Sequence, residues 1–182
     1  MDLHAWITQQ VDRVQVAALD ATPHSWRDET SPEHGFRVGT TDEAEWVAFT
    51  GGPDDDPKQS AADARHIAMN DPATVLRRCH ADRRILARHA VDPAAADSRL
   101  FATACRGCGT EGDCDDPVTQ NINDCPELLD LAHAHGITDD ILAGLDRPQA
   151  PEVKPRSLAD ILAPYTPMRD VPAALRGPNW TP

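Results

Sequence analysis

The chain has 182 residues, enough for one ordinary domain and a tail. Its 30 acidic and 17 basic side chains give a formal charge of −13, which disfavours direct binding to nucleic-acid phosphates and suits a basic protein partner. The N-terminus carries no basic or apolar run, and no stretch approaches the roughly 18 apolar residues of a membrane span, so we expect a cytoplasmic protein that makes no membrane contact.

The first fifty residues predict a helix followed by a small sheet. Residues 2–20 place apolar side chains at steps of three and four, the spacing of one helix face, and Pro23 ends that pattern. Aromatic and β-branched residues between glycines over residues 25–50 indicate a β-hairpin, with Trp26 at its entrance. Because two strands alone are marginally stable in water, we expect this hairpin to pack on helices.

Two more helices are predicted before the chain becomes irregular. One covers residues 60–70, and the next begins at Asp71-Pro72, where aspartate can cap a helix and proline needs no backbone partner. This second helix extends to about residue 90. His89 at its end lies within about 60° of Leu86 around the helix axis, so we expect the imidazole to point inward.

The second half of the chain alternates irregular and helical segments. Residues 91–124 lack clear periodicity and are too long for an unsupported loop, so something must order them. Residues 124–136 and 137–145 predict two short helices. Prolines dominate the remainder. We therefore expect a mainly α-helical α+β protein, with a single zinc-stapled domain over residues 1–146 and a proline-rich tail over residues 147–182.

Four of the five cysteines lie between positions 105 and 125, which favours a metal over disulfides where no secretion signal is expected. Cys105 and Cys108 form a Cys-x-x-Cys pair on a glycine-containing turn, and Cys125 begins a helix, where the thiolate is favoured. Zn²⁺ needs four nitrogen or sulfur ligands. Two candidates for the fourth stay open: Cys114, which is local and a thiolate and has a slight preference on spacing, and His89. A closed site would be structural.

Several short motifs follow one another along the chain: Ala21-Thr22-Pro23-x-x-Trp26, Ala64-Arg65-His66-Ile67-Ala68-x-x-Asp71-Pro72-Ala73-x-Val75-Leu76-Arg77, Arg83-Arg84-Ile85-Leu86-x-x-His89, Cys105-x-x-Cys108 and Cys125-Pro126-x-Leu128. In this order they resemble a family of uncharacterised actinobacterial and actinophage proteins of unknown function. A cysteine at the place of Cys114 is not part of that family's pattern. The resemblance therefore implies His89, Cys105, Cys108 and Cys125 as the metal ligands, and it implies no activity.

Three functions are compatible with these features. The leading hypothesis is a non-enzymatic binding or regulatory protein with one structural zinc site, whose surface engages a protein partner. The second is a metal-dependent hydrolase or nuclease with an open zinc site, for which the sequence offers no convincing general base. The third is an acidic decoy that mimics nucleic acid and binds a basic protein, and it rests on the net charge alone.

Two further groups of polar residues favour structural interpretations. His66 and Asp71 could form a base and its orienting carboxylate, but a histidine on a helix beside a capping aspartate is more often structural. The arginines from Arg77 to Arg88 could meet nucleic acid or an acidic partner. Their alternating faces and the overall charge favour a solvated helix instead.

Overall fold

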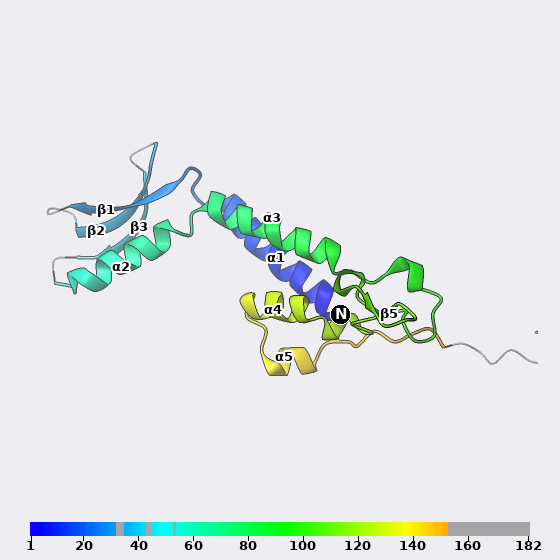
Figure 1. Cartoon of the computed structure of the whole chain (residues 1–182). Coiled ribbons are helices and arrows are strands. Elements are labelled where there is room, and N and C mark those ends of the chain that lie inside the picture. The colour runs from blue at the N-terminus through cyan, green and yellow to red at the C-terminus, as the bar shows by residue number, and fades with distance from the viewer. Residues whose placement is uncertain (32–34, 43–44, 53, 153–182) are drawn as a thin grey trace, which may run out of the picture. The chain divides into compact units, whose positions relative to one another are not determined.

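The computed structural model describes residues 1–31, 35–42, 45–52 and 54–152 (Figure 1). The chain divides into two compact units, Met1–Ala150 and Pro151–Pro182. The predicted tail lies almost wholly outside the described residues, so the domain boundary at residue 146 stays a prediction. Within the described part, no helix combines the length and the apolar character needed to cross a membrane.

Three helices surround the main hydrophobic core: α1 (Leu3–Asp20), α3 (Pro72–Arg88) and α4 (Pro126–Ala134). The side chain of Asp2 caps α1 by accepting a hydrogen bond from the Ala5 N–H at 2.8 Å, as the preference of helix starts for aspartate predicts. The core is aliphatic and aromatic and includes three cysteines, and its largest members are Leu3, Trp6, Ile7, Val11, Cys79, Leu86, Cys105, Ile122, Cys125, Leu128 and Leu131.

A small antiparallel sheet packs against α2 (Pro57–Ala68). Its strand order is β1 (Trp26–Ser31), β2 (Gly35–Thr40) and β3 (Trp46–Gly51), so the predicted hairpin gains a third strand. Apart from the tryptophan, β1 is polar and has no apolar alternation to reveal it. Its place comes from pairing along the whole of β2, where Glu29 lies opposite Arg37 and the two side chains form an ion pair.

The close contact between α2 and the sheet depends on a glycine at the end of β3. A Cβ atom at Gly51 would lie 2.0 Å from the Ser60 hydroxyl oxygen and 2.6 Å from the Ser60 Cβ. On the adjoining residue, the Thr50 hydroxyl donates a hydrogen bond to the Ser60 carbonyl at 2.9 Å. Ser60 itself is buried. Only glycine permits the helix to approach the strand this closely.

The segment between α3 and α4 contains little regular structure. It holds a two-stranded ladder of β4 (Thr110–Glu111) and β5 (Asp116–Pro117) and the short 3-10 turns η1 (Pro93–Ala95), η2 (Arg106–Cys108) and η3 (Ile122–Asp124). After α4, the chain forms α5 (Asp139–Ala143). These elements confirm the mainly helical α+β class and the two predicted short helices.

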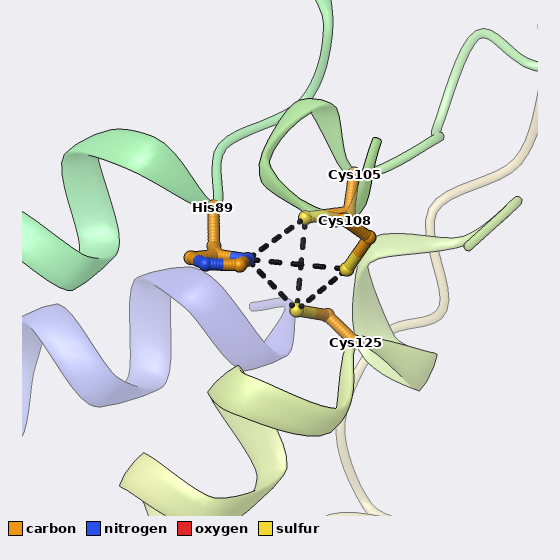
Figure 2. A group of neighbouring side chains, drawn as sticks. All are labelled: His89, Cys105, Cys108 and Cys125. Atoms are coloured by element: carbon orange, nitrogen blue, oxygen red, sulfur yellow. Dashed lines mark hydrogen bonds between the residues drawn. The ribbon is translucent and has the colours of Figure 1, made fainter. Parts of the chain in front are cut away.

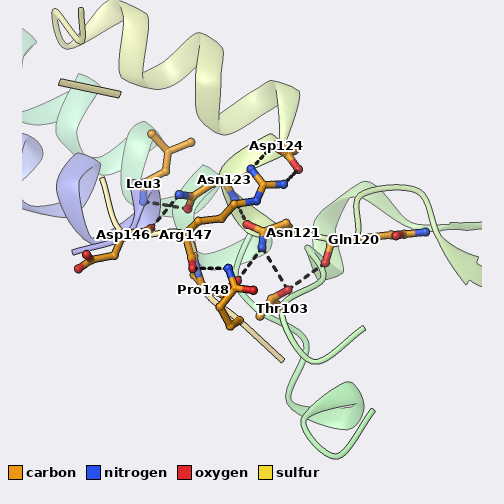
Figure 3. A network of polar contacts seen from close by, with 10 residues as sticks. Leu3, Thr103, Gln120, Asn121, Asn123, Asp124, Asp146, Arg147 and Pro148 are labelled. Carbon is orange, nitrogen blue, oxygen red and sulfur yellow. Dashed lines mark hydrogen bonds and ion pairs between the residues drawn. The ribbon is translucent and has the colours of Figure 1, made fainter. Parts of the chain in front are cut away.

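A polar clasp made of Asn121 and Asn123 ties this segment to the start of the chain (Figure 3). The Asn123 side chain accepts from the Leu3 N–H at 3.1 Å and donates to the Asp146 carbonyl at 2.9 Å. The Asn121 side chain donates to the Pro148 carbonyl at 2.8 Å and accepts from the Asn123 N–H. Because Asn123 lies two residues before Cys125, the clasp also fixes the approach to α4.

Candidate metal centre

Three segments that are far apart in the sequence converge at the edge of the core (Figure 2). His89 is the C-cap residue of α3, and its N–H donates to the Ile85 carbonyl at 2.9 Å. Cys105 and Cys108 stand at the beginning and end of the η2 turn. Cys125 is the residue before Pro126, the first residue of α4. The structure therefore brings together the imidazole and three thiols that the family resemblance implied.

The η2 turn lies against the end of α3 because Gly107 has no side chain. A Cβ atom at this position would lie 2.7 Å from both the Arg88 carbonyl oxygen and the His89 Nδ1 atom. Backbone hydrogen bonds hold the turn in place, from the Arg106 N–H to the Ala90 carbonyl and from the Cys105 N–H to the Thr119 carbonyl, each at 3.0 Å. The glycine between the two cysteines is thus a packing requirement of the site.

The donor atoms of the four side chains have the separations of a small tetrahedron. The Cys125 sulfur lies 3.6 Å from that of Cys105 and 3.4 Å from that of Cys108. The His89 Nδ1 atom lies 3.5, 3.9 and 3.4 Å from the sulfurs of Cys105, Cys108 and Cys125. Tetrahedral Zn²⁺, with bonds of about 2.3 Å to sulfur and 2.0–2.1 Å to nitrogen, implies edges of about 3.8 and 3.6 Å. The group could therefore hold a metal ion.

The sulfurs are too far apart for a disulfide, whose bond is about 2.05 Å long, and all five cysteines are free. Burial raises the pKa of the Cys108 thiol, and it raises the pKa of the Cys125 thiol well above its usual range, with the neighbouring sulfurs adding to the effect. The N–H of Leu128 works in the opposite direction at Cys125. The raised pKa values favour the protonated thiols in the absence of a metal. A bound divalent cation would favour the thiolates instead, since coordination deprotonates thiols.

Cys114 does not take part in this group. It is exposed and lies in the turn between β4 and β5. The alternative set built on Cys114 is thus not the one that the fold assembles. Spacing along the chain favoured it because Cys114 is nearer in sequence, whereas His89 comes close only through the packing of α3 against the η2 turn.

Glu127 is a neighbour of the group that the sequence reasoning missed. Its Oε2 atom lies 3.6 Å from the sulfurs of Cys108 and Cys125 and 3.8 Å from the His89 Nδ1 atom. Half of its side chain remains exposed. The signal was its position two residues after a cysteine in the first turn of a helix, where a carboxylate is favoured for helix stability alone.

His66 and Asp71 do not form a catalytic pair. Asp71 is buried and caps α3, accepting a hydrogen bond from the Thr74 N–H at 2.6 Å. Burial opposes its charged form, but the hydrogen bonds from Thr74, the charge of Arg77 and a hydrogen bond from the Trp26 backbone together lower the pKa of Asp71. His66 is exposed on α2, and no hydrogen bond joins the two side chains. Their structural interpretation is therefore the better one.

Together, the fold and the site define a small α+β protein with a buried group of one histidine and three cysteines that could hold a metal ion. A comparison with protein families matches residues 1–136 to a family described as a family of unknown function, DUF6221. The chain belongs to this family, which confirms the resemblance to a family of unknown function. The searches of curated proteins and of solved structures found no match.

Proposed function

We propose that the protein is a non-enzymatic binding or regulatory module whose domain is stapled by one structural Zn²⁺, bound by His89, Cys105, Cys108 and Cys125. The observation that carries the proposal is the tetrahedral spacing of four nitrogen and sulfur donors within 4.8 Å of one another. Four such donors fill the coordination sphere of zinc and leave no position for a reacting water molecule. The metal would then act on folding and not on chemistry.

The location of the group supports a structural role. Cys105 and Cys125 are about as buried as the leucines of the core, with 1% and 0% of their surface exposed, and they pack in the same cluster as Leu128. One ion would thus join the end of α3, the η2 turn and the start of α4 at a single point. Because such a site does not exist in the unfolded chain, the free energy of metal binding becomes free energy of folding.

The test is elemental analysis of the purified wild type and of His89→Ala, with thermal unfolding of each protein. We expect about one zinc per wild-type chain, since the described residues assemble one set of four ligand candidates. His89→Ala should lose most of the metal and unfold at a lower temperature. A wild type that is folded and free of metal in the presence of excess zinc would refute the proposal.

Cys114→Ala is the matched control, because it removes a thiol of the same loop that lies outside the group. It should retain the full zinc content and the wild-type unfolding temperature. Loss of zinc in this variant, with retention in His89→Ala, would move the site to the alternative four-cysteine set and contradict the geometry above.

A second candidate, a metal-dependent hydrolase, draws on Glu127. Cys108 is the half-buried member of the group, and its sulfur lies 3.6 Å from the Glu127 carboxylate. If a bound ion released Cys108, a water molecule could take the open position, and Glu127 could act on it as a general base. Zinc-dependent hydrolysis of an activated ester or phosphodiester that disappears in Glu127→Gln, with the metal content unchanged, would favour this candidate. We expect no such activity from the closed site.

A further inference from the structure

The outward face of α3 carries a row of arginines. Arg77, Arg84 and Arg88 point within about 40° of one another around the helix axis, on the side opposite Cys79 and Leu86, which are buried. All three arginines are exposed. From first to last they span about 16.5 Å of helix. The sequence predicted arginines on alternating faces of this helix. Only Arg78 and Arg83 follow that prediction, since they lie on either side of the outward face.

The five arginines of α3 differ in how far the protein itself engages them. Arg83 pairs with Asp12 at 2.8 Å, and Arg78 donates to the Asn70 side chain at 2.7 Å. Arg77 donates a local hydrogen bond to the Thr74 hydroxyl at 2.7 Å, and its charge lowers the pKa of Asp71, the N-cap residue of α3. Among the described residues, Arg84 and Arg88 make no hydrogen bond or ion pair. Two guanidinium groups on the outward face therefore remain available to a partner.

The same face lacks the acidic residues that normally accompany basic ones on a solvated helix. Asp82 is the single carboxylate of α3, and its side chain is turned to His135 of α4, which it meets at 3.0 Å. Only 18% of the Asp82 side chain is exposed. In a chain with 30 acidic residues, a helix face with three arginines and no carboxylate departs from the overall composition.

The candidate metal centre adds a fourth guanidinium next to this row. Arg106 lies between the two cysteines of the η2 turn, and its Nη2 atom donates to the Ala87 carbonyl at 3.0 Å, in the last turn of α3. Ala87 is the neighbour of Arg88 in the chain. The packing of η2 against α3 thus places a positive charge at the C-terminal end of the row, which also suits the negative end of the helix dipole.

We propose that this arginine row, defined as Arg77, Arg84, Arg88 and Arg106, docks an acidic segment of another protein. The proposal rests on the binding role proposed above and names the chemistry of the partner. Guanidinium groups bind carboxylates through paired N–H donors. A partner helix that lies antiparallel to α3 would match the row if it carried three carboxylates, the second four residues and the third eleven residues after the first. These carboxylates would face Arg88, Arg84 and Arg77 in that order. The net charge of −13 repels a nucleic acid along its whole length, whereas a short acidic segment meets mainly the row.

The test uses fluorescence anisotropy at low salt with a labelled helical peptide of about 18 residues that carries glutamates at this spacing. A second peptide has glutamine at the same positions, and a DNA duplex of about 20 base pairs serves as the nucleic-acid probe. The proteins are the wild type, Arg84→Gln/Arg88→Gln, and the charge-matched control Arg13→Gln/Arg99→Gln, whose arginines are exposed elsewhere. Circular dichroism establishes that each variant is folded.

We expect the glutamate peptide to bind and the glutamine peptide not to bind. The row variant should weaken binding about tenfold, and the control variant less than about twofold, because only the row forms ion pairs with the peptide. Equal weakening by both variants, or no binding of the glutamate peptide, would overturn the proposal. Tighter binding of the duplex that depends on the row would replace the acidic protein with a nucleic acid.

The zinc content of each sample separates this proposal from the preceding one. A protein with about one zinc per chain that ignores the glutamate peptide would refute the arginine row and leave the structural site intact. A metal-free protein that still binds the glutamate peptide would refute the structural zinc site and leave the arginine row intact.

Discussion

Two regions of this protein reach an ordered structure by different means. The sheet and α2 are held by backbone pairing along the strands and by a close approach of helix to strand at Gly51. The segment between α3 and α4 has only two residues in each of its strands. It is held mainly by side chains that converge at two places, the candidate metal centre and the asparagine clasp. Its four metal-ligand candidates and its asparagine clasp replace the regular ladder.

The comparison teaches that the long segment depends on a few side chains, whereas the sheet depends on many equivalent backbone contacts. Loss of one ligand candidate or one asparagine should therefore have a large and local effect. Substitutions that disturb the sheet should leave the metal centre in place.

Cys125→Ser should have the largest effect. The thiol is fully buried and contacts the other three members of the group, so its loss removes the metal and leaves a polar hydroxyl in the core. We expect the free energy of unfolding to fall by about 3–5 kcal/mol, measured by urea denaturation with zinc present. Cys114→Ser is the control and should change it by less than about 0.5 kcal/mol. Equal losses of unfolding free energy in the two variants would contradict the assignment of Cys125, and not Cys114, to the metal centre.

Gly51→Ala tests the other region. The new Cβ atom would overlap the Ser60 side chain, so α2 must shift from the sheet at a cost of about 3 kcal/mol. Hydrogen exchange should show weaker protection of the sheet amides, while the zinc content stays at the wild-type level. The double variant Gly51→Ala/Ser60→Gly should recover most of the protection, because it removes both atoms that the new methyl group meets.

Asn123→Ala separates the clasp from the metal centre. The change leaves the Leu3 N–H and the Asp146 carbonyl without their side-chain partner, and Asn123 is buried. We expect a loss of about 2 kcal/mol in thermal or chemical unfolding, with zinc retained. Gln59→Ala, which removes an exposed amide bonded to Asp63 on α2, should cost far less. A neutral Asn123→Ala would show that the clasp contributes nothing.

Asp71→Asn should have the smallest effect, and that effect should depend on pH. The pKa of Asp71 is lower in the folded protein than in the unfolded chain, so the carboxylate stabilises the fold above the unfolded value of about 3.9. This contribution is lost as the pH falls through the lowered folded pKa. The free energy of unfolding, measured by urea denaturation, should be about 1 kcal/mol higher for the wild type than for the variant at neutral pH, and the two values should converge in acid. A difference that grows in acid would contradict the sign of the shift.

The sequence predicted the features that depend on local periodicity and capping. The apolar steps from Leu3 to Val11 identified α1, and Asp71-Pro72 marked the start of α3 at the residue where it begins. The inward direction of His89 also followed from helix geometry, and its side chain is 9% exposed. These features are set by residues within two turns of one another.

The features that the sequence did not predict depend on distant contacts. β1 is a strand because β2 pairs with it, and its own residues carry no alternating pattern. The two asparagines of the clasp act through partners at both ends of the chain. The arginine row also depends in part on distant contacts, because Arg78 bonds to Asn70 and Arg83 pairs with Asp12, which leaves the outward face to the remaining three arginines of α3.

X-ray absorption spectroscopy at the zinc edge of the purified protein tests the central claim most directly. The proposed site predicts three sulfur neighbours at about 2.3 Å and one nitrogen at about 2.0–2.1 Å, with the outer-shell scattering of an imidazole. A shell of four sulfurs would assign the fourth position to Cys114 and contradict the geometry of the group. Three protein ligands with a water oxygen would contradict the closed, structural site.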